Sequence, residues 1–147
     1  MIQGDSWLQF VFGIQPASYD EFYNPVYGDR PDFFGDPRIR KALASCLDRE
    51  AMLDAATNGL GEIWPSFLAP DQSRLSSEAV LSYNTALSQQ LLTEAGWVDH
   101  DNNPQTALQA WGVLNVPNGT PFSLTMLTDQ SGFHRAISEI VQASLNQ

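Results

Sequence analysis

Few side chains in this chain of 147 residues could do chemistry, and they are scattered along it. His134 lies close in sequence to Asp129 and Ser131, which are the residue types that a serine hydrolase combines. No serine, however, lies in the glycine-flanked turn that exposes a nucleophile. His100 falls in a polar turn, too far from His134 in sequence to predict a metal site. We therefore expect no catalytic residue and no metal ligand in this set.

A second candidate is the acidic stretch of Asp99, Asp101 and Asn103, which has the spacing that opens a calcium-binding loop. Such a loop needs glycine at its sixth place and glutamate at its twelfth, where this chain has Pro104 and Ala110. The stretch is therefore expected to be a solvated turn.

Two further features are also better explained by structure than by chemistry. Gly59 and Gly61 begin like a dinucleotide-binding fingerprint, but Trp64 takes the place of the third glycine and no strand precedes them. Cys46 is the only cysteine, so the chain forms no internal disulfide. It falls on the apolar face of a predicted helix, which indicates a buried and unreactive thiol.

The composition narrows the class of partner. Hydrophobic residues make up 43% of the chain, enough for a folded core, and the net charge is −10. An acidic surface repels phosphate, so nucleic acid and anionic membranes are not expected partners. No apolar run is long enough to span a bilayer, and residues 1–5 lack the features of a signal peptide. We expect either a cytoplasmic protein or a piece of a longer one.

Apolar spacing predicts an α/β fold of the mixed α+β kind, with helices packed on a small mixed sheet, and residues 1–147 as a single domain. The expected helices lie near residues 37–47, 49–58, 84–95 and 132–146. The expected strands lie at residues 6–15 and 122–128, with a further strand near Val113. On the last helix, the side chains expected to dock firmly are Phe133, Ile137, Ile140, Val141 and Leu145.

Aromatic side chains gather in two irregular segments, 16–34 and 61–70, which are rich in proline and glycine. Composition alone favours a role in the core for them, because aromatic side chains are usually buried. The alternative is a ligand cleft, since long loops often carry binding residues. The candidates for that cleft are Trp64, Phe67, Tyr19, Tyr23 and Tyr27.

Several blocks of sequence carry a resemblance to a known family. Residues 34–43 read FGDPRIRKAL, residues 47–52 read LDREAM, and residues 83–97 read YNTALSQQLLTEAGW. In order, these resemble F-x-D-x-R-V-R-x-A-L, I-D-R-x-x-I and Y-[ND]-P-x-x-A-x-x-L-L-x-E-A-G-W of the family 5 extracellular solute-binding proteins. The final helix, from Arg135 to Leu145, is similar to that family's R-x-x-[AS]-x-x-[IV]-Q-x-x-L. Thr85 and Ser88 depart from the pattern, where the family usually has proline and alanine.

The resemblance implies a periplasmic-binding-protein-like lobe without enzymatic activity or a cofactor. It implies a protein of two lobes that closes over an extracellular solute, most often a peptide, and delivers it to an ABC permease. This chain matches part of the second lobe. A location outside the cytoplasmic membrane follows, extracellular or periplasmic, with a lipoprotein anchor in the full-length protein.

The sequence is also compatible with two other functional classes. One is a stand-alone, non-catalytic protein-interaction domain, and the other is a degenerate enzyme lobe, although no acid, base and nucleophile set is visible. We also expect the chain to self-associate, because the strand that follows the last helix in the family is not part of it and leaves a sheet edge open.

Overall fold

The computed structural model describes residues 33–63 and 81–146, and residues 1–32, 64–80 and 147 lie outside that description. Its elements are α1 (Pro37–Cys46), α2 (Arg49–Thr57), α3 (Thr85–Glu94), β1 (Trp97–Val98), β2 (Gln109–Ala110) and α4 (Gly132–Leu145). The predicted helices are therefore confirmed to within one or two residues at their ends. The strand expected at residues 6–15 lies outside the described residues.

Each helix begins at a polar side chain that accepts a hydrogen bond from a free backbone amide of the first turn. The four capping residues are Asp36, Asp48, Asn84 and Ser131. Asn84 also donates its own backbone amide to the carbonyl oxygen of Ser45 at 2.7 Å, which ties the start of α3 to the end of α1. These caps set where the helices start and hold α3 against α1.

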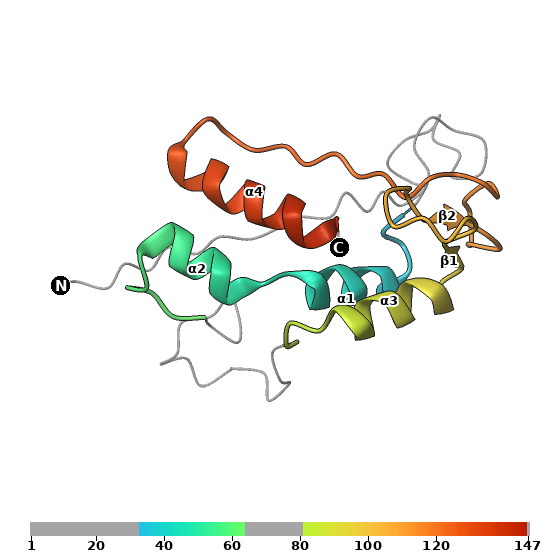
Figure 1. The fold of residues 1–147 in the computed structure, drawn as a ribbon, viewed down its shortest axis with the longest axis horizontal. Helices are drawn as coiled ribbons and strands as arrows, with labels where there is room; N and C mark the ends of the chain where they lie inside the picture. The colour runs from blue at the N-terminus through green and yellow to red at the C-terminus, as the bar shows by residue number, and fades with distance from the viewer. Residues whose placement is uncertain (1–32, 64–80, 147) are drawn as a thin grey trace.

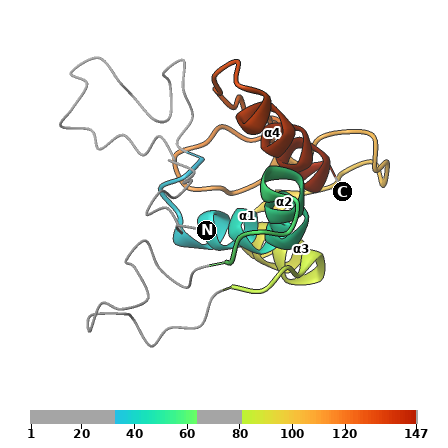
Figure 2. The ribbon, with the colours of Figure 1, turned by 90° about the vertical axis from the view of Figure 1, so that its left-hand side faces the viewer.

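The main core lies between α1, α3 and the segment that carries β1 and β2. In Figures 1 and 2, α1 and α3 run side by side, and the β segment lies at one end of the pair. The buried side chains of this core are Ile39, Ala42, Leu43, Leu92, Ala95, Trp97, Ala110, Val113 and Val116. On α1 the core residues are Ile39, Ala42 and Leu43, which are spaced so that they share one face of the helix. This face packs against α3.

A second, smaller core joins α2 to α4 through Met52, Ile137 and Val141. The expectation that the whole apolar stripe of α4 docks is wrong at both ends, because Phe133 is 44% exposed and Leu145 is 37% exposed. The buried face of α4 follows Ile137, Val141 and Ser144, and at its far end it meets α1, where the Cys46 thiol donates to the carbonyl of Ser144. Leu145 is one residue past Ser144, so it points about 100° away from this face. Phe133 lies in the first turn of α4, ahead of the first buried residue of the face.

The described sheet is smaller than expected. It consists of β1 paired antiparallel with β2, with Trp97 opposite Ala110 and Val98 opposite Gln109. Val113 lies in the turns that follow β2 rather than in a strand, and its side chain is buried in the core. The strand expected at residues 122–128 is wrong as well. Pairing ends where Pro121 bridges Gln109, because no neighbouring strand of the described chain runs beside residues 123–128.

In residues 33–63 and 81–146, no helix combines the length and the apolar character that crossing a bilayer requires.

Candidate functional site

The five aromatic residues predicted for a ligand cleft are not placed by the structure. Trp64, Phe67, Tyr19, Tyr23 and Tyr27 all lie outside the described residues. Their role in a cleft therefore stays a prediction. What the structure does describe is the set of residues that carry the family resemblance.

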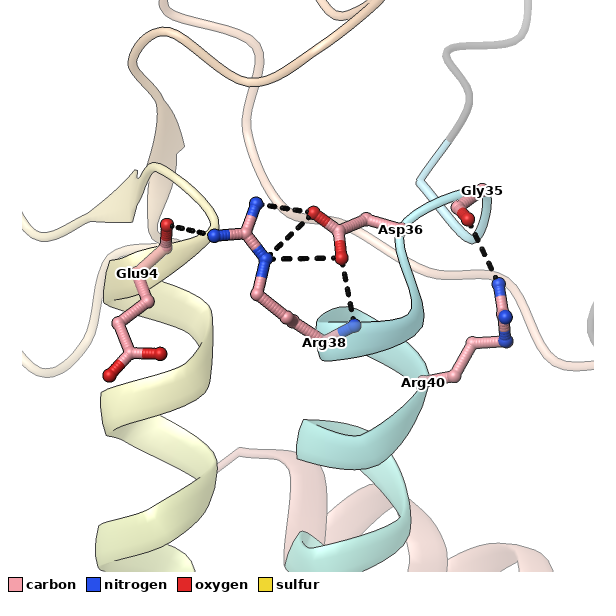
Figure 3. Close-up of polar contacts among 5 residues, drawn as sticks. All are labelled: Gly35, Asp36, Arg38, Arg40 and Glu94. Atoms are coloured by element: carbon pink, nitrogen blue, oxygen red, sulfur yellow. Dashed lines mark hydrogen bonds and ion pairs between the residues drawn. The ribbon is translucent and has the colours of Figure 1, made fainter.

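Arg38 joins the start of α1 to the end of α3 (Figure 3). Its Nε and Nη2 atoms donate to the carboxylate of Asp36 at 3.0 and 2.6 Å, and its Nη1 atom donates to the backbone carbonyl of Glu94 at 2.6 Å. Glu94 is the last residue of α3, where helix carbonyls have no partner within the helix and the helix dipole favours a cation. We call this set of Asp36, Arg38 and the Glu94 carbonyl the Arg38 bridge.

The two charges of the Arg38 bridge stabilise each other. Hydrogen bonds from the Arg38 side chain lower the pKa of the Asp36 carboxyl, and the Asp36 side chain raises the pKa of Arg38. Arg40, two residues further along α1 and on the opposite side of the helix, donates from Nη1 to the backbone carbonyls of Phe34 and Gly35. Both arginines are thus directed at the protein's own backbone, which indicates a structural role for them.

We predict that Arg38→Gln destabilises the fold more than Arg135→Gln does. Arg135 is a matched control, because it is also a surface arginine in a helix, and among the described residues its side chain donates to Glu139, one turn away at 3.0 Å. Loss of the Arg38 side chain leaves the Glu94 carbonyl without its partner and the Asp36 carboxylate with only its backbone bond to residue 38, whereas exposed pairs within one helix contribute little. Urea unfolding midpoints of the two variants would measure this, and equal midpoints would contradict a joining role for Arg38.

Gly96 and Trp97, which end the third block of the resemblance, bring α3 onto β2. The φ angle of Gly96 is +96°, and a Cβ atom on it would lie 2.6 Å from the carbonyl oxygen of Trp111. Trp97 is fully buried, with Phe33 and Phe122 packed against its ring at centroid distances of 5.2 and 4.6 Å. Trp97 therefore belongs to an aromatic cluster within the main core.

The cluster of Asp129, Ser131 and His134 forms a helix cap. Ser131 Oγ accepts from the backbone amide of His134 at 3.2 Å, and Asp129 Oδ1 accepts from the amide of Ser131 at 2.9 Å. The His134 ring turns the other way, with Nδ1 at 2.7 Å from Asp129 Oδ2. In a hydrolase the histidine would contact the serine hydroxyl. In this chain the Ser131 hydroxyl instead accepts from the backbone of His134, at the start of α4.

The acidity of Asp129 gives a pH-dependent prediction. Hydrogen bonds from Ser131, together with a smaller contribution from His134, lower the pKa of Asp129 from its ordinary value of 3.8 to about 2. Because the unfolded chain takes up the proton first, the stabilisation is complete above about pH 4 and is lost as the pH falls towards 2. Asp129→Asn removes this contribution.

The measurement is the urea midpoint of the wild-type chain minus that of Asp129→Asn, taken at steps from pH 5 down to pH 2. The difference should shrink over that interval. A difference that stays constant across it would show that the Asp129 charge does not stabilise the fold.

The carboxylates of the acidic stretch after β1 accept hydrogen bonds from backbone amides of the same stretch. Asp99 Oδ1 accepts from the amides of Asp101 and Asn102, and Asp101 Oδ1 accepts from Asn103 and from the Thr106 hydroxyl. No group of three potential metal-binding side chains occurs among the described residues. This is the solvated turn that the sequence predicts.

Cys46 is half-buried, and its thiol donates to the backbone carbonyl of Ser144 at 2.8 Å, so it links α1 to α4. Burial raises the pKa of this thiol, which keeps it protonated and unreactive near neutral pH.

An open hollow of about 1520 Å³ lies between α3, α4 and the extended chain that leads into α4. Leu92 and Ser88 of α3 line it on one side, and Val141 and Ser138 of α4 line it on the other. Leu124, in the extended chain, also lines the hollow. The side chains around it come from helices that elsewhere form the two cores, so the hollow separates these cores.

Comparison with known proteins assigns the chain to a family. The sequence profile of the bacterial extracellular solute-binding proteins, family 5 Middle, matches residues 11–147. The chain belongs to this family. The blocks that resemble it, including the Arg38 bridge and Gly96 with Trp97, lie within the matched range.

Two family relatives are similar in sequence or in structure. The oligopeptide-binding protein AppA of Bacillus subtilis (strain 168) is 29% identical over 125 residues, which cover 82% of this chain and 21% of AppA. The structure of AppA in complex with a nonapeptide matches with a TM-score of 0.64 and 28% identity, covering 78% of this chain and 22% of that one. NikA from Brucella suis, solved in complex with Fe(III)-EDTA, matches with a TM-score of 0.62 and 21% identity, covering 76% of this chain and 21% of that one.

These matches confirm the predicted fold class, a mixed α/β lobe of the periplasmic-binding-protein type. The chain spans about a fifth of the length of the relatives it matches. AppA and the matching family are named as binding proteins, which is consistent with the expectation that this chain is not an enzyme.

Proposed function

We propose that this chain is part of the second lobe of a larger, two-lobed protein, the substrate-binding component of an ABC importer. The observation that carries the proposal is the family match over residues 11–147, together with the order of the blocks along the chain. The solute is a peptide. AppA, which is 29% identical, is an oligopeptide-binding protein, and its structure was solved with a nonapeptide. The likeness to NikA, at 21% identity, supports the fold alone.

The arrangement of α1 and α3 suits a lobe that moves as a unit. The Arg38 bridge, the bond from Asn84 to Ser45 and the core around Trp97 hold these helices together without any ligand. In hinge closure, rigid parts turn about a few residues, and the ligand is held between them. Ligand then stabilises the closed form by binding it better than the open form. A shift from 1:99 to 99:1 requires about a 10⁴-fold difference in affinity.

The partner that follows from this function is a membrane permease, which receives the peptide from the closed form. The corresponding location is extracellular or periplasmic, with the longer protein held at the membrane by a lipid anchor. Trp64 and Phe67, with Tyr19, Tyr23 and Tyr27, are our candidates for the rim of the peptide cleft, because aromatic side chains in irregular segments often form such rims.

A thermal-shift screen of the full-length protein tests the substrate class. The protein is heated with pools of peptides of graded length and, separately, with nickel salts and other small solutes. A ligand at a hundred times its Kd stabilises the native state by about 2.7 kcal/mol, so peptides should raise the Tm clearly. A protein stabilised only by a non-peptide solute would contradict the peptide assignment and leave the transport role intact.

A further inference from the structure

The dipeptide Asn-Gly occurs at two places in the chain, residues 58–59 and 118–119. Asparagine before glycine is chemically labile, because glycine has no Cβ atom to shield its backbone nitrogen from the asparagine side chain. The nitrogen attacks the side-chain Cγ atom and a succinimide ring forms. The Cγ–Nδ2 bond breaks, and the amide proton leaves with the ammonia. Water then opens the ring to aspartate or isoaspartate, so the reaction adds a negative charge.

Hydrogen bonds hold both reacting groups of the second dipeptide. The backbone amide of Gly119 donates to the carbonyl of Ala110 at 2.9 Å. The side-chain Oδ1 of Asn118 accepts from the amide of Gly112 at 2.8 Å. The carbonyl of Thr120 accepts from the amide of Ala110, also at 2.9 Å, and fixes the same turn to β2. A nitrogen held in this way can attack only when the turn opens, although Asn118 itself is exposed.

The first dipeptide lies at the end of α2 and is held less firmly. Asn58 follows the last residue of the helix in the left-handed conformation, with φ at 51° and ψ at 41°, and its backbone amide donates to the carbonyl of Asp54. Among the described residues, neither the Asn58 side chain nor the Gly59 amide forms a hydrogen bond. Both residues are exposed, and helix ends open at little cost in free energy. Two equally exposed dipeptides of the same sequence thus differ in how far the fold restrains them.

We propose that Asn58 is a site of spontaneous deamidation, and that its conversion weakens the packing of α2 on α4. The new carboxylate lies at the C-terminal end of α2, where the helix dipole disfavours a negative charge. Asp54 is one turn earlier, and its Oδ1 atom is 3.5 Å from the position that a Cβ atom on Gly59 would take. No basic residue in the last turn offsets the repulsion between the two carboxylates.

The consequence for packing follows from the small size of the second core. On α2 its buried residue is Met52, which meets Ile137 and Val141 of α4. Isoaspartate also places an additional carbon in the main chain, which removes the left-handed cap that ends α2. A helix of nine residues depends on such packing and capping, since short helices are marginal by themselves.

Peptide mass spectrometry of the folded chain, incubated in a mildly alkaline buffer and then digested, measures conversion at both asparagines in one sample. We expect Asn58 to convert faster than Asn118 by about ten-fold or more, because two hydrogen bonds of ordinary strength must open at the second site. In urea that unfolds the chain, the two rates should become similar. Conversion of Asn118 at an equal or higher rate in the folded chain would overturn the proposal, and so would a difference that persists in urea.

Two substitutions test the effect on α2. Asn58→Gly should keep the urea midpoint and prevent the reaction at this position, because glycine adopts the left-handed conformation without strain. Asn58→Asp should lower the midpoint, and added salt should reduce that loss by screening the charges. Incubation should lower the midpoint of the wild-type chain and leave that of Asn58→Gly unchanged. Conversion of Asn58 in the wild-type chain without any fall in midpoint would overturn the proposed effect on packing.

Discussion

Replacing Trp97 by alanine should lower the free energy of unfolding by about 3–5 kcal/mol, as is usual for a large aromatic side chain removed from a core. Trp97 has no exposed surface, and its ring contacts Phe33 and Phe122. Its loss opens a cavity between α3 and the segment that carries β2, which neighbouring side chains fill only in part. Urea denaturation followed by circular dichroism measures the change.

Trp111→Ala is the matched control for this prediction. Trp111 directly follows β2, is 63% exposed, and its ring contacts His100. Exposed substitutions of this kind usually change stability by less than about 0.5 kcal/mol. If the two variants unfold at the same urea concentration, Trp97 does not organise the core.

Gly96→Ala should cause the second large loss of stability. A Cβ atom at this position would lie 2.6 Å from a backbone oxygen, that of Trp111, and backbone cannot move aside as a flexible side chain can. The φ angle of +96° adds strain for any residue with a Cβ atom. We therefore expect the close approach of α3 and β2 to be disrupted, with a lower urea midpoint.

Gly112→Ala distinguishes the two causes of this loss, the steric clash and the backbone strain. Gly112 also has a positive φ angle, +72°, but a Cβ atom there would meet no heavy atom within 4 Å. Backbone strain is thus common to both variants, and only Gly96→Ala adds the clash. The difference between their free energies of unfolding should be about 1–3 kcal/mol, the usual cost of overpacking. Equal losses would mean that strain alone explains the glycine.

The helices and their starts could be predicted from sequence, because the information is local. Asp36, Asp48 and Asn84 precede apolar residues at helical spacing, and each caps a helix. The uncharged run at residues 122–128 has the alternation of a strand as well. A strand also needs a neighbour, however, and no neighbour of this segment lies among the described residues.

Contacts between distant segments could not be predicted. Nothing in the local sequence indicates that Arg38 meets the carbonyl of Glu94, 56 residues away. The D-x-R spacing of Asp36 and Arg38, at the start of a helix, was the available signal, but it does not identify the second helix. Which face of α4 is buried likewise depends on α2 and α1, which are different segments of the chain.

The ligand site was predictable only at the level of the family. The motifs that carry the resemblance are structural where the structure describes them, since Arg38, Arg40 and Trp97 bind or pack against the chain itself. They identify the fold and leave the ligand-contacting residues to other segments. This is why strong family motifs gave the class of protein and no contact to a solute.

The central claim is that the longer protein captures peptides. Identifying the molecules that are bound to the purified protein tests this claim most directly. The full-length protein is purified without added ligand, denatured, and the released small molecules are identified by mass spectrometry. Peptides should be released in a roughly one-to-one ratio with the protein, and they should bind again when returned to the refolded, emptied protein. Release of a metal chelate or another non-peptide solute, together with no binding of added peptides, would contradict the account.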